Sequence, residues 1–259
     1  MTILCIETST SVCSAAVCKD GALIKQCISY EGSNHARLLP SYIEELLSFT
    51  REQHLSLDAV ALSEGPGSYT GLRIGTSTAK GLCYGLSIPL IPVPTLEVLC
   101  EAARQHSAFS IHHSDILIPM IDARRMEVYT AIFDSESKVE SRKSKEERAR
   151  AVVVENEESV LCQNSGLYSV SAAVCTLAAE RSYFYFGDGA EKCAKIFTKP
   201  NWHFIPCIVP EAQFMGALVE SRKSKVESRK MISGAELAYY EPFYLKEFIA
   251  APSHVKGLN

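Results

Sequence analysis

The sequence predicts an α/β protein built from two similar lobes. Three observations lead to this fold class. The chain opens with apolar strand-like runs around a tight-turn signal, its next segments alternate between helical and strand-like periodicity, and the same order recurs more loosely in the second half. Because such alternation favours sheets covered by helices, two βββαβα halves predict two sheets with a crevice between them.

The first three strands are expected within residues 3–29. Ile3–Glu7 is apolar enough for a buried strand, and it ends in a short tip of acid and hydroxyl side chains. Ser14–Cys18 and Ala22–Ser29 flank Asp20-Gly21, and an Asp-Gly pair between apolar runs is a strong hairpin signal. The chain is therefore expected to open as three antiparallel strands.

The rest of the first lobe, residues 1–105, is expected to alternate helix and strand. A helix capped by Ser33 or Asn34 carries apolar residues with a period near 3.6, namely Leu38, Leu39, Tyr42, Ile43, Leu46 and Leu47. The segments that follow are a strand at Asp58–Leu62, a helix at Leu72–Leu86, a strand at Pro89–Pro94, and a helix at Leu96–Gln105 capped by Thr95.

The second lobe, residues 106–259, repeats this order less clearly. Its expected strands are Asp115–Ile121, Glu127–Phe133, Ala151–Val154, Ser182–Phe186 and His203–Val209. Its expected helices are Ser169–Glu180, Gly189–Phe197 and Glu211–Glu220, with the last helix packing back on the first lobe.

Two charged insertions interrupt the second lobe near residues 135–150 and 220–230. Each contains the heptapeptide Ser-Lys-Val-Glu-Ser-Arg-Lys, at 137–143 and 224–230. One apolar residue in seven cannot form a coiled-coil seam, so we favour solvated insertions. The alternative, a basic patch that contacts RNA, is weakened by the glutamates and by the lack of aromatic residues.

Composition excludes several classes of function. With 259 residues and 47% hydrophobic content, the chain can bury a large core, and its net charge of −4 argues against binding DNA or RNA through the whole surface. The ten cysteines form no CxxC pair and mostly lie in apolar runs, which suits buried thiols in a reducing cytoplasm. No apolar run approaches the about 20 residues that span a membrane.

A glycine-rich loop at Ser63–Gly75 lies between a predicted strand and a predicted helix. Such a loop can present backbone N–H groups to a phosphate at a helix N-terminus. An alternative reading uses the same glycines for packing, because Gly71, Gly75 and Ala79 recur at every fourth position and form a helix face that another helix can approach closely.

Four segments resemble the TsaD/TsaB family: Ile3–Ser9, Ser63–Gly75, Asp122–Tyr129 and Tyr244–Lys246. The glycine-rich loop is especially similar to that of TsaB. The resemblance implies an actin-like fold with ribonuclease H-like lobes, as in sugar kinases and Hsp70. It also implies a role in forming N6-threonylcarbamoyladenosine at position 37 of tRNA.

Within this family, TsaD is the catalytic member and carries two metal-binding histidines after the strand that matches Pro89–Pro94. Here those positions are Thr95 and Leu99, which cannot replace imidazole ligands. No acid follows Ser9, where TsaD has an aspartate. His106, His112 and His113 cluster near the lobe junction but are expected in an exposed linker. We therefore expect no catalytic residue, no metal site and no cofactor of this chain alone.

The resemblance to TsaB implies a dimerisation subunit that pairs with TsaD, with itself when alone, with TsaE through the complex, and with tRNA only indirectly. ATP or ADP would then bind at the shared complex. The expected partner interface lies on the first two helices and comprises Leu39, Tyr42, Ile43, Leu46, Arg73, Thr76, Ala79, Lys80 and Cys83. A vestigial anion or nucleotide site would comprise Glu7, Ser9, Gly65, Gly67, Ser68, Thr70, Gly71 and Asp122.

Two enzymatic alternatives remain. The first is a nucleotide-binding phosphotransferase or hydrolase of the same fold, with the glycine loop on the phosphates and Glu7 or Asp122 as magnesium ligand or general base. The second is a metalloprotease, which the absence of histidine at Thr95 and Leu99 makes the weakest reading.

Overall fold

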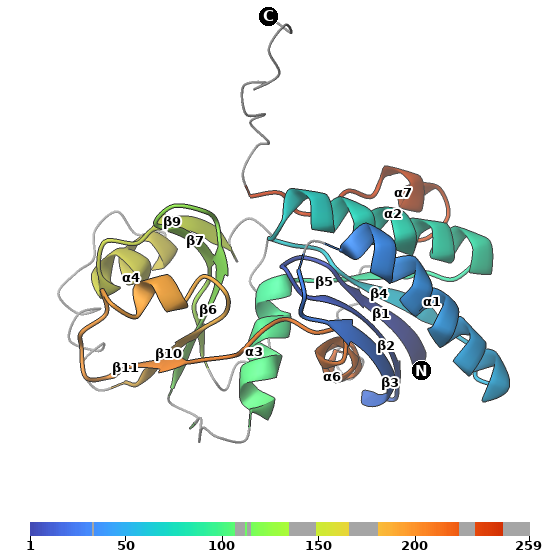
Figure 1. The fold of residues 1–259 in the computed structure, drawn as a ribbon, viewed down its shortest axis with the longest axis horizontal. Coiled ribbons are helices and arrows are strands. Elements are labelled where there is room, and N and C mark those ends of the chain that lie inside the picture. The colour runs from blue at the N-terminus through green and yellow to red at the C-terminus, as the bar shows by residue number, and fades with distance from the viewer. Residues whose placement is uncertain are drawn as a thin grey trace, which may run out of the picture.

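A computed structural model describes residues 1–32, 34–106, 112, 115–134, 149–165, 181–222 and 231–245. These residues form two lobes, each centred on one sheet (Figure 1). The repeated heptapeptides, His113 and the predicted helix at Ser169–Glu180 lie outside the described residues.

The first sheet has the strand order β3-β2-β1-β4-β5. Its strands are β1 (Thr2–Glu7), β2 (Cys13–Lys19), β3 (Ala22–Ser29), β4 (Ala59–Ser63) and β5 (Leu90–Val93). The first three are antiparallel, with Asp20 and Gly21 at positive φ in the turn, while β4 and β5 run parallel to β1. The predicted hairpin is therefore confirmed.

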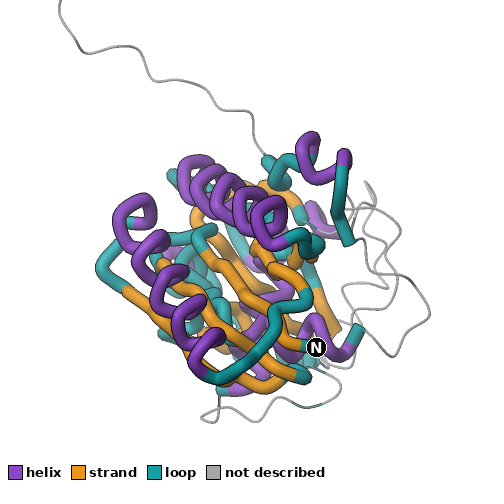
Figure 2. Tube along the Cα trace, turned by 90° about the vertical axis from the view of Figure 1, so that its right-hand side faces the viewer, coloured by secondary structure: helices purple, strands orange, loops and turns teal. Residues whose placement is uncertain are grey.

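Alternating side chains of β1 fill a core on each face of this sheet. Leu4 and Ile6 pack with α1 (His35–Glu52) and α2 (Tyr69–Leu86), and Figure 2 shows these two long helices crossing the strands. Ile3 and Cys5 face the opposite side, where residues of α3 (Thr95–Gln105) and α6 (Phe214–Ser221) complete the core. This period of two is the pattern of a sheet buried on both faces.

The second sheet repeats the first. Its strands are β6 (Ile116–Asp122), β7 (Glu127–Thr130), β8 (Phe133–Asp134), β9 (Arg150–Val153), β10 (Tyr183–Phe186) and β11 (Trp202–Ile205). The order β9-β7-β6-β10-β11 matches β3-β2-β1-β4-β5, with β7 and β9 antiparallel and β10 and β11 parallel. Besides α6, the described helices after β9 are α4 (Glu157–Ser165), the 3-10 turn η2 (Glu191–Cys193) and α7 (Ala235–Tyr239). The duplicated two-lobe prediction is confirmed.

Two local predictions were wrong. The helix expected at Gly189–Phe197 is only the single turn η2 with flanking turns, because the backbone is held against β6 by the bond from Gly189 N to Met120 O, 3.0 Å. Thr95 begins α3 but does not cap it, since its hydroxyl bonds to Ser63 Oγ at 2.7 Å and Pro94 is the N-cap residue.

Composition predicted buried thiols and no segment that spans a membrane. Seven of the described cysteines are buried, as expected for thiols in apolar runs, whereas Cys207 is exposed on backbone with φ of 62°. Within the described ranges, no helix has the length and apolar character needed to cross a membrane.

Candidate functional site

The glycine-rich loop joins the end of β4 to the start of α2 in the first lobe. Ser68 is the N-cap of α2, and its hydroxyl accepts a bond from Gly71 N at 3.4 Å. α2 therefore begins three residues earlier than its apolar period suggests, because capping is decided by the hydroxyl and not by the apolar pattern.

In this loop, the space that a side chain would need on a glycine is filled by other atoms of the chain. A Cβ at Gly67 would collide with Ser9, and a Cβ at Gly71 or Gly75 would collide with Thr8. Thr8 Oγ1 also donates to Gly71 O at 2.8 Å, and Ser68 N donates to Ser9 O at 2.6 Å. The glycines thus serve close packing, as the second reading proposed, although they face the tip of β1 and not another helix.

Gly65 makes a similar contact with the C-terminal segment. Its φ is 111°, and a Cβ there would collide with Phe243 O. Phe243 N donates to Glu64 O at 2.7 Å, so the segment after α7 lies directly on the loop. Of the other residues expected at an anion site, Ser68 and Thr70 are exposed.

Glu7 ends β1 as a buried carboxyl group. It is 0% exposed, and its Oε1 accepts a bond from Ser9 N at 2.6 Å. Glu7 Oε2 and Ser9 Oγ have no hydrogen-bond partner among the described residues. Burial raises the pKa of Glu7, although the hydrogen bond from Ser9 N acts in the opposite direction. Burial therefore works against the ionised carboxylate that a magnesium ligand requires.

The positions that the resemblance assigns to metal-binding histidines lie in the interior. Thr95 and Leu99 are both 0% exposed, and Leu99 belongs to the core shared with β6. In the part of the chain that the structure describes, no group of three or more His, Cys, Asp or Glu side chains is placed to hold a metal ion.

A small cavity lies between the lobes at the same loop. Its volume is about 30 Å³, enough for a molecule the size of water. It is lined by Glu64, Gly65, Pro66, Pro94, Leu96, Glu97, Phe133, Ala149 and Phe243. The buried Glu97 forms an ion pair with Arg222, so this carboxylate is neutralised within the chain.

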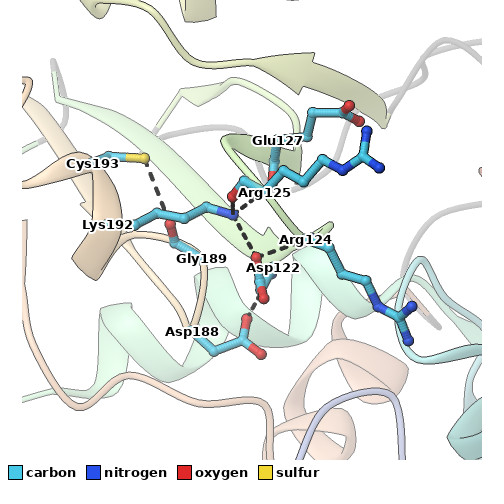
Figure 3. A network of polar contacts seen from close by, with 8 residues as sticks. All are labelled: Asp122, Arg124, Arg125, Glu127, Asp188, Gly189, Lys192 and Cys193. Atoms are coloured by element: carbon cyan, nitrogen blue, oxygen red, sulfur yellow. Dashed lines mark hydrogen bonds and ion pairs between the residues drawn. The ribbon is translucent and has the colours of Figure 1, made fainter.

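The corresponding strand end in the second lobe is open and charged (Figure 3). Asp122 ends β6, and Asp188 follows β10 and accepts a bond from Asp122 N at 3.0 Å. Lys192 Nζ forms an ion pair with Asp122 and also donates to Arg125 O at 2.9 Å and Glu127 O at 2.7 Å. Asp122 bonds here within the second lobe, so the structure does not bring it together with the glycine loop.

Asp188 is exposed as a residue, although its carboxyl group is largely surrounded by protein atoms. This local desolvation raises the pKa of Asp188, and the negative charge of Asp122 adds to the shift.

Most of the residues expected at a partner interface are part of the core. Leu39, Ile43, Leu46, Ala79 and Cys83 pack in one cluster under α1 and α2, and Thr76 is also buried. In the isolated chain these side chains leave little surface for a partner, because the apolar period of a helix marks the side that covers its own sheet. Arg73 remains exposed and lies over the Tyr69 ring, while Tyr42 and Lys80 are half-buried.

Three of the exposed large apolar residues lie on α2 and α7. Tyr84 is 85% exposed, Tyr239 is 86% exposed and Leu86 is 44% exposed. Lys80 Nζ donates to Ala238 O and to Tyr240 O, at 2.6 and 3.2 Å, and thereby holds α7 beside α2 (Figure 1). These residues are not among the predicted interface residues. The pattern that could have indicated them is the occurrence of apolar and small residues on the side of α2 opposite its buried side.

Two lobes of the same strand order, meeting at a crevice crossed by the C-terminal segment, define the two-lobed actin-like class of α/β proteins. Solved structures support this class. A protein from Pseudomonas aeruginosa described as similar to peptidase YEAZ matches with a TM-score of 0.67 and 22% identity, covering 95% of this chain and 99% of that one. YeaZ from the same organism matches with a TM-score of 0.64 and 23% identity, covering 94% and 99%.

The family model of TsaD, tRNA N6-adenosine threonylcarbamoyltransferase, matches residues 29–202, more than half of the chain. TsaB of Bacillus subtilis is 36% identical over 134 residues, and TsaB of Escherichia coli is 35% identical over 132. Both alignments cover 51% of this chain, and they cover 55% and 54% of those proteins. The chain belongs to the TsaD family and is similar to its TsaB (YeaZ) members, and its alignments span about half the length of these curated relatives.

Proposed function

We propose that this chain is a non-catalytic scaffold subunit in the formation of N6-threonylcarbamoyladenosine in tRNA, and that it binds a TsaD subunit. The relatives named above are biosynthesis proteins of this modification, and the family model describes the transferase. TsaE would join through the complex, any ATP or ADP would bind there, and a second copy would occupy the same surface when TsaD is absent.

The observation that carries the proposal is the outward surface of α2 and α7. We call it the α2–α7 face and define it as Ser77, Gly81, Tyr84, Gly85, Leu86 and Tyr239, all exposed. Nothing lies within 4 Å of a Cβ placed on Gly81 or Gly85. A glycine inside a helix costs roughly 0.5–1 kcal/mol relative to alanine, and these two gain no contact within the described chain. Small residues beside exposed tyrosines suit close docking of another helix, with the aromatic rings as anchors.

The first-lobe strand end supports the non-catalytic part of the proposal. Thr95 and Leu99 stand at the positions of the metal ligands, and the glycine loop is packed against Thr8 and Ser9. The alternative of a nucleotide-dependent phosphotransferase or hydrolase requires ligand space at this loop. It would be supported by nucleotide hydrolysis that disappears in both Glu7→Ala and Asp122→Ala.

Pairing with TsaD from the same organism can be measured by calorimetry and size-exclusion chromatography. Tyr84→Asp combined with Tyr239→Asp is expected to abolish pairing, because two charges would be buried without partners. Both side chains are largely exposed, so the isolated variant should remain folded by circular dichroism. A matched control is Leu23→Asp with Val153→Asp, which adds the same charge at exposed apolar positions on strands β3 and β9. This control variant should pair normally.

Two outcomes would contradict the proposal at different levels. Normal pairing of the tyrosine variant would remove the α2–α7 face as the contact surface. Failure of the unmodified chain to bind TsaD would remove the scaffold function itself.

A further inference from the structure

The turn between β6 and β7 carries two adjacent arginines, Arg124 and Arg125, which we call the arginine turn. It follows the carboxyl end of β6, next to the end of the parallel strand β10. Open α/β sheets bind their ligands at such strand ends. In the first lobe the equivalent place is occupied by Thr8, Ser9 and the glycine loop, whereas here the side chains reach solvent.

The backbone of the arginine turn is held in an unfavourable conformation. Arg124 and Arg125 have φ of 69° and 51°, the left-handed region that costs a residue other than glycine roughly 1–2 kcal/mol. Arg124 N donates to Asp122 Oδ1 at 3.1 Å, and Glu127 N donates to Arg124 O at 3.1 Å. Lys192 adds its bonds to Arg125 O and Glu127 O, so one ammonium group fixes both ends of the turn.

The same network leaves the two guanidinium groups available. Lys192 neutralises Asp122, which precedes the turn, while Glu127 follows it. Both arginines are exposed. In Figure 3 both side chains extend away from Lys192. A rigid turn therefore presents two positive forks outward.

We propose that the arginine turn binds phosphate groups of an RNA backbone. The inference rests on the proposed function, which makes tRNA the substrate of the assembled complex. Guanidinium groups match phosphate oxygens with two parallel hydrogen bonds, and arginine is the preferred residue for such contacts. Because the chain carries a net charge of −4, attraction of RNA must come from a local site of this kind.

The place of the turn in the fold also favours a substrate contact. Figure 1 shows β7 and the end of the second sheet at the top of the molecule, the side on which α2 and α7 cover the first sheet. A tRNA held by a partner on the α2–α7 face would lie on the same side of the molecule as β7.

The test measures binding of an unmodified tRNA transcript by fluorescence anisotropy, at several salt concentrations, to the complex with TsaD and to this chain alone. Arg124→Ala with Arg125→Ala is expected to weaken binding about tenfold and to reduce the salt slope of log K by about 1 to 2. Arg124→Lys with Arg125→Lys keeps the charge but loses the fork, so it should bind at an intermediate level.

A control with the same change in net charge is Lys19→Ala with Lys195→Ala, two exposed lysines away from the turn. It should bind tRNA nearly as well as the unmodified chain. Equal losses in the arginine and lysine variants would overturn the proposal, as would unchanged tRNA binding in the arginine variant.

Pairing with TsaD is measured separately, without tRNA, for every variant. Loss of pairing in the arginine variant would show that the arginines contact acidic groups of the partner, which also overturns the proposal. If the unmodified chain does not pair with TsaD, the scaffold function fails. The RNA proposal is then decided by the same variants of the chain alone.

Discussion

The two lobes share one strand order, yet their equivalent strand ends have opposite character. At the end of β1, Glu7 is buried, and the glycine loop packs on Thr8 and Ser9. At the end of β6, Asp122 is exposed, paired with Lys192 and next to two outward arginines. A duplicated topology thus conserves the place of a site while the side chains decide whether that place is closed or open.

The contrast also explains how the glycines differ within one helix. Gly71 and Gly75 lie against Thr8, so they are needed for the closed strand end. Gly81 and Gly85 meet open space and belong to the α2–α7 face. Position on the helix, and not residue type, assigns the first pair to packing and the second to the face proposed for docking.

The largest expected effect comes from disrupting the packing of the glycine loop at the end of β1. Gly71→Ala should destabilise the chain by about 3 kcal/mol or more, because its Cβ would collide with a backbone carbonyl that cannot rotate away. Urea unfolding followed by circular dichroism measures the effect. Gly81→Ala is the control on the same helix and should stabilise the isolated chain by roughly 0.5–1 kcal/mol. Equal effects of the two substitutions would contradict the packing role of Gly71.

A smaller effect is expected from removing the ion pair at the open strand end. Lys192→Met should cost about 1.5–3 kcal/mol, since Asp122 and two carbonyl groups lose a charged donor that is only partly exposed. Hydrogen exchange should increase at the arginine turn and β7 and remain unchanged in the first lobe. Lys195→Met, an exposed neighbour, is the control. Exchange that rises equally in both lobes would show that the two strand ends are coupled.

The smallest expected effect is a pH dependence of folding stability that differs between the strand ends in the two lobes. Burial raises the pKa of Glu7 in the folded state, so neutral Glu7 favours folding. Its stabilising contribution is complete below the unfolded pKa and is lost as pH rises through the folded pKa. Glu7→Gln cannot ionise, so its stability relative to the unmodified chain should increase across that pH range and then level off.

Asp188→Asn is the matched comparison for Glu7→Gln. The pKa of Asp188 is also raised in the folded state, so its effect on stability has the same sign as that of Glu7. Because Asp188 is exposed, the change of stability with pH should be smaller. Unfolding curves at a series of pH values measure both. A larger pH dependence for Asp188 than for Glu7 would contradict the assignment of the first strand end as the closed one.

Much of the fold could be predicted from local patterns. The Asp20-Gly21 turn, the buried run of β1 and the repeated order of segments predicted the two sheets. The short η2 turn and the role of Thr95 could not be predicted, because contacts with β6 and Ser63, distant in sequence, decide them. For the predicted interface residues, the apolar side of a helix predicts burial, and only packing shows what covers it.

The sequence by itself determined the fold class, the resemblance to TsaB and the substitution of both metal-ligand positions by Thr95 and Leu99. These properties depend on residue type and spacing along the chain. The tertiary structure alone decided that the glycine loop is closed by Thr8 and Ser9, that Tyr84 and Tyr239 share one exposed face, and that Lys192 fixes the arginine turn. Each of these depends on atoms that are far apart in the chain and meet only after folding.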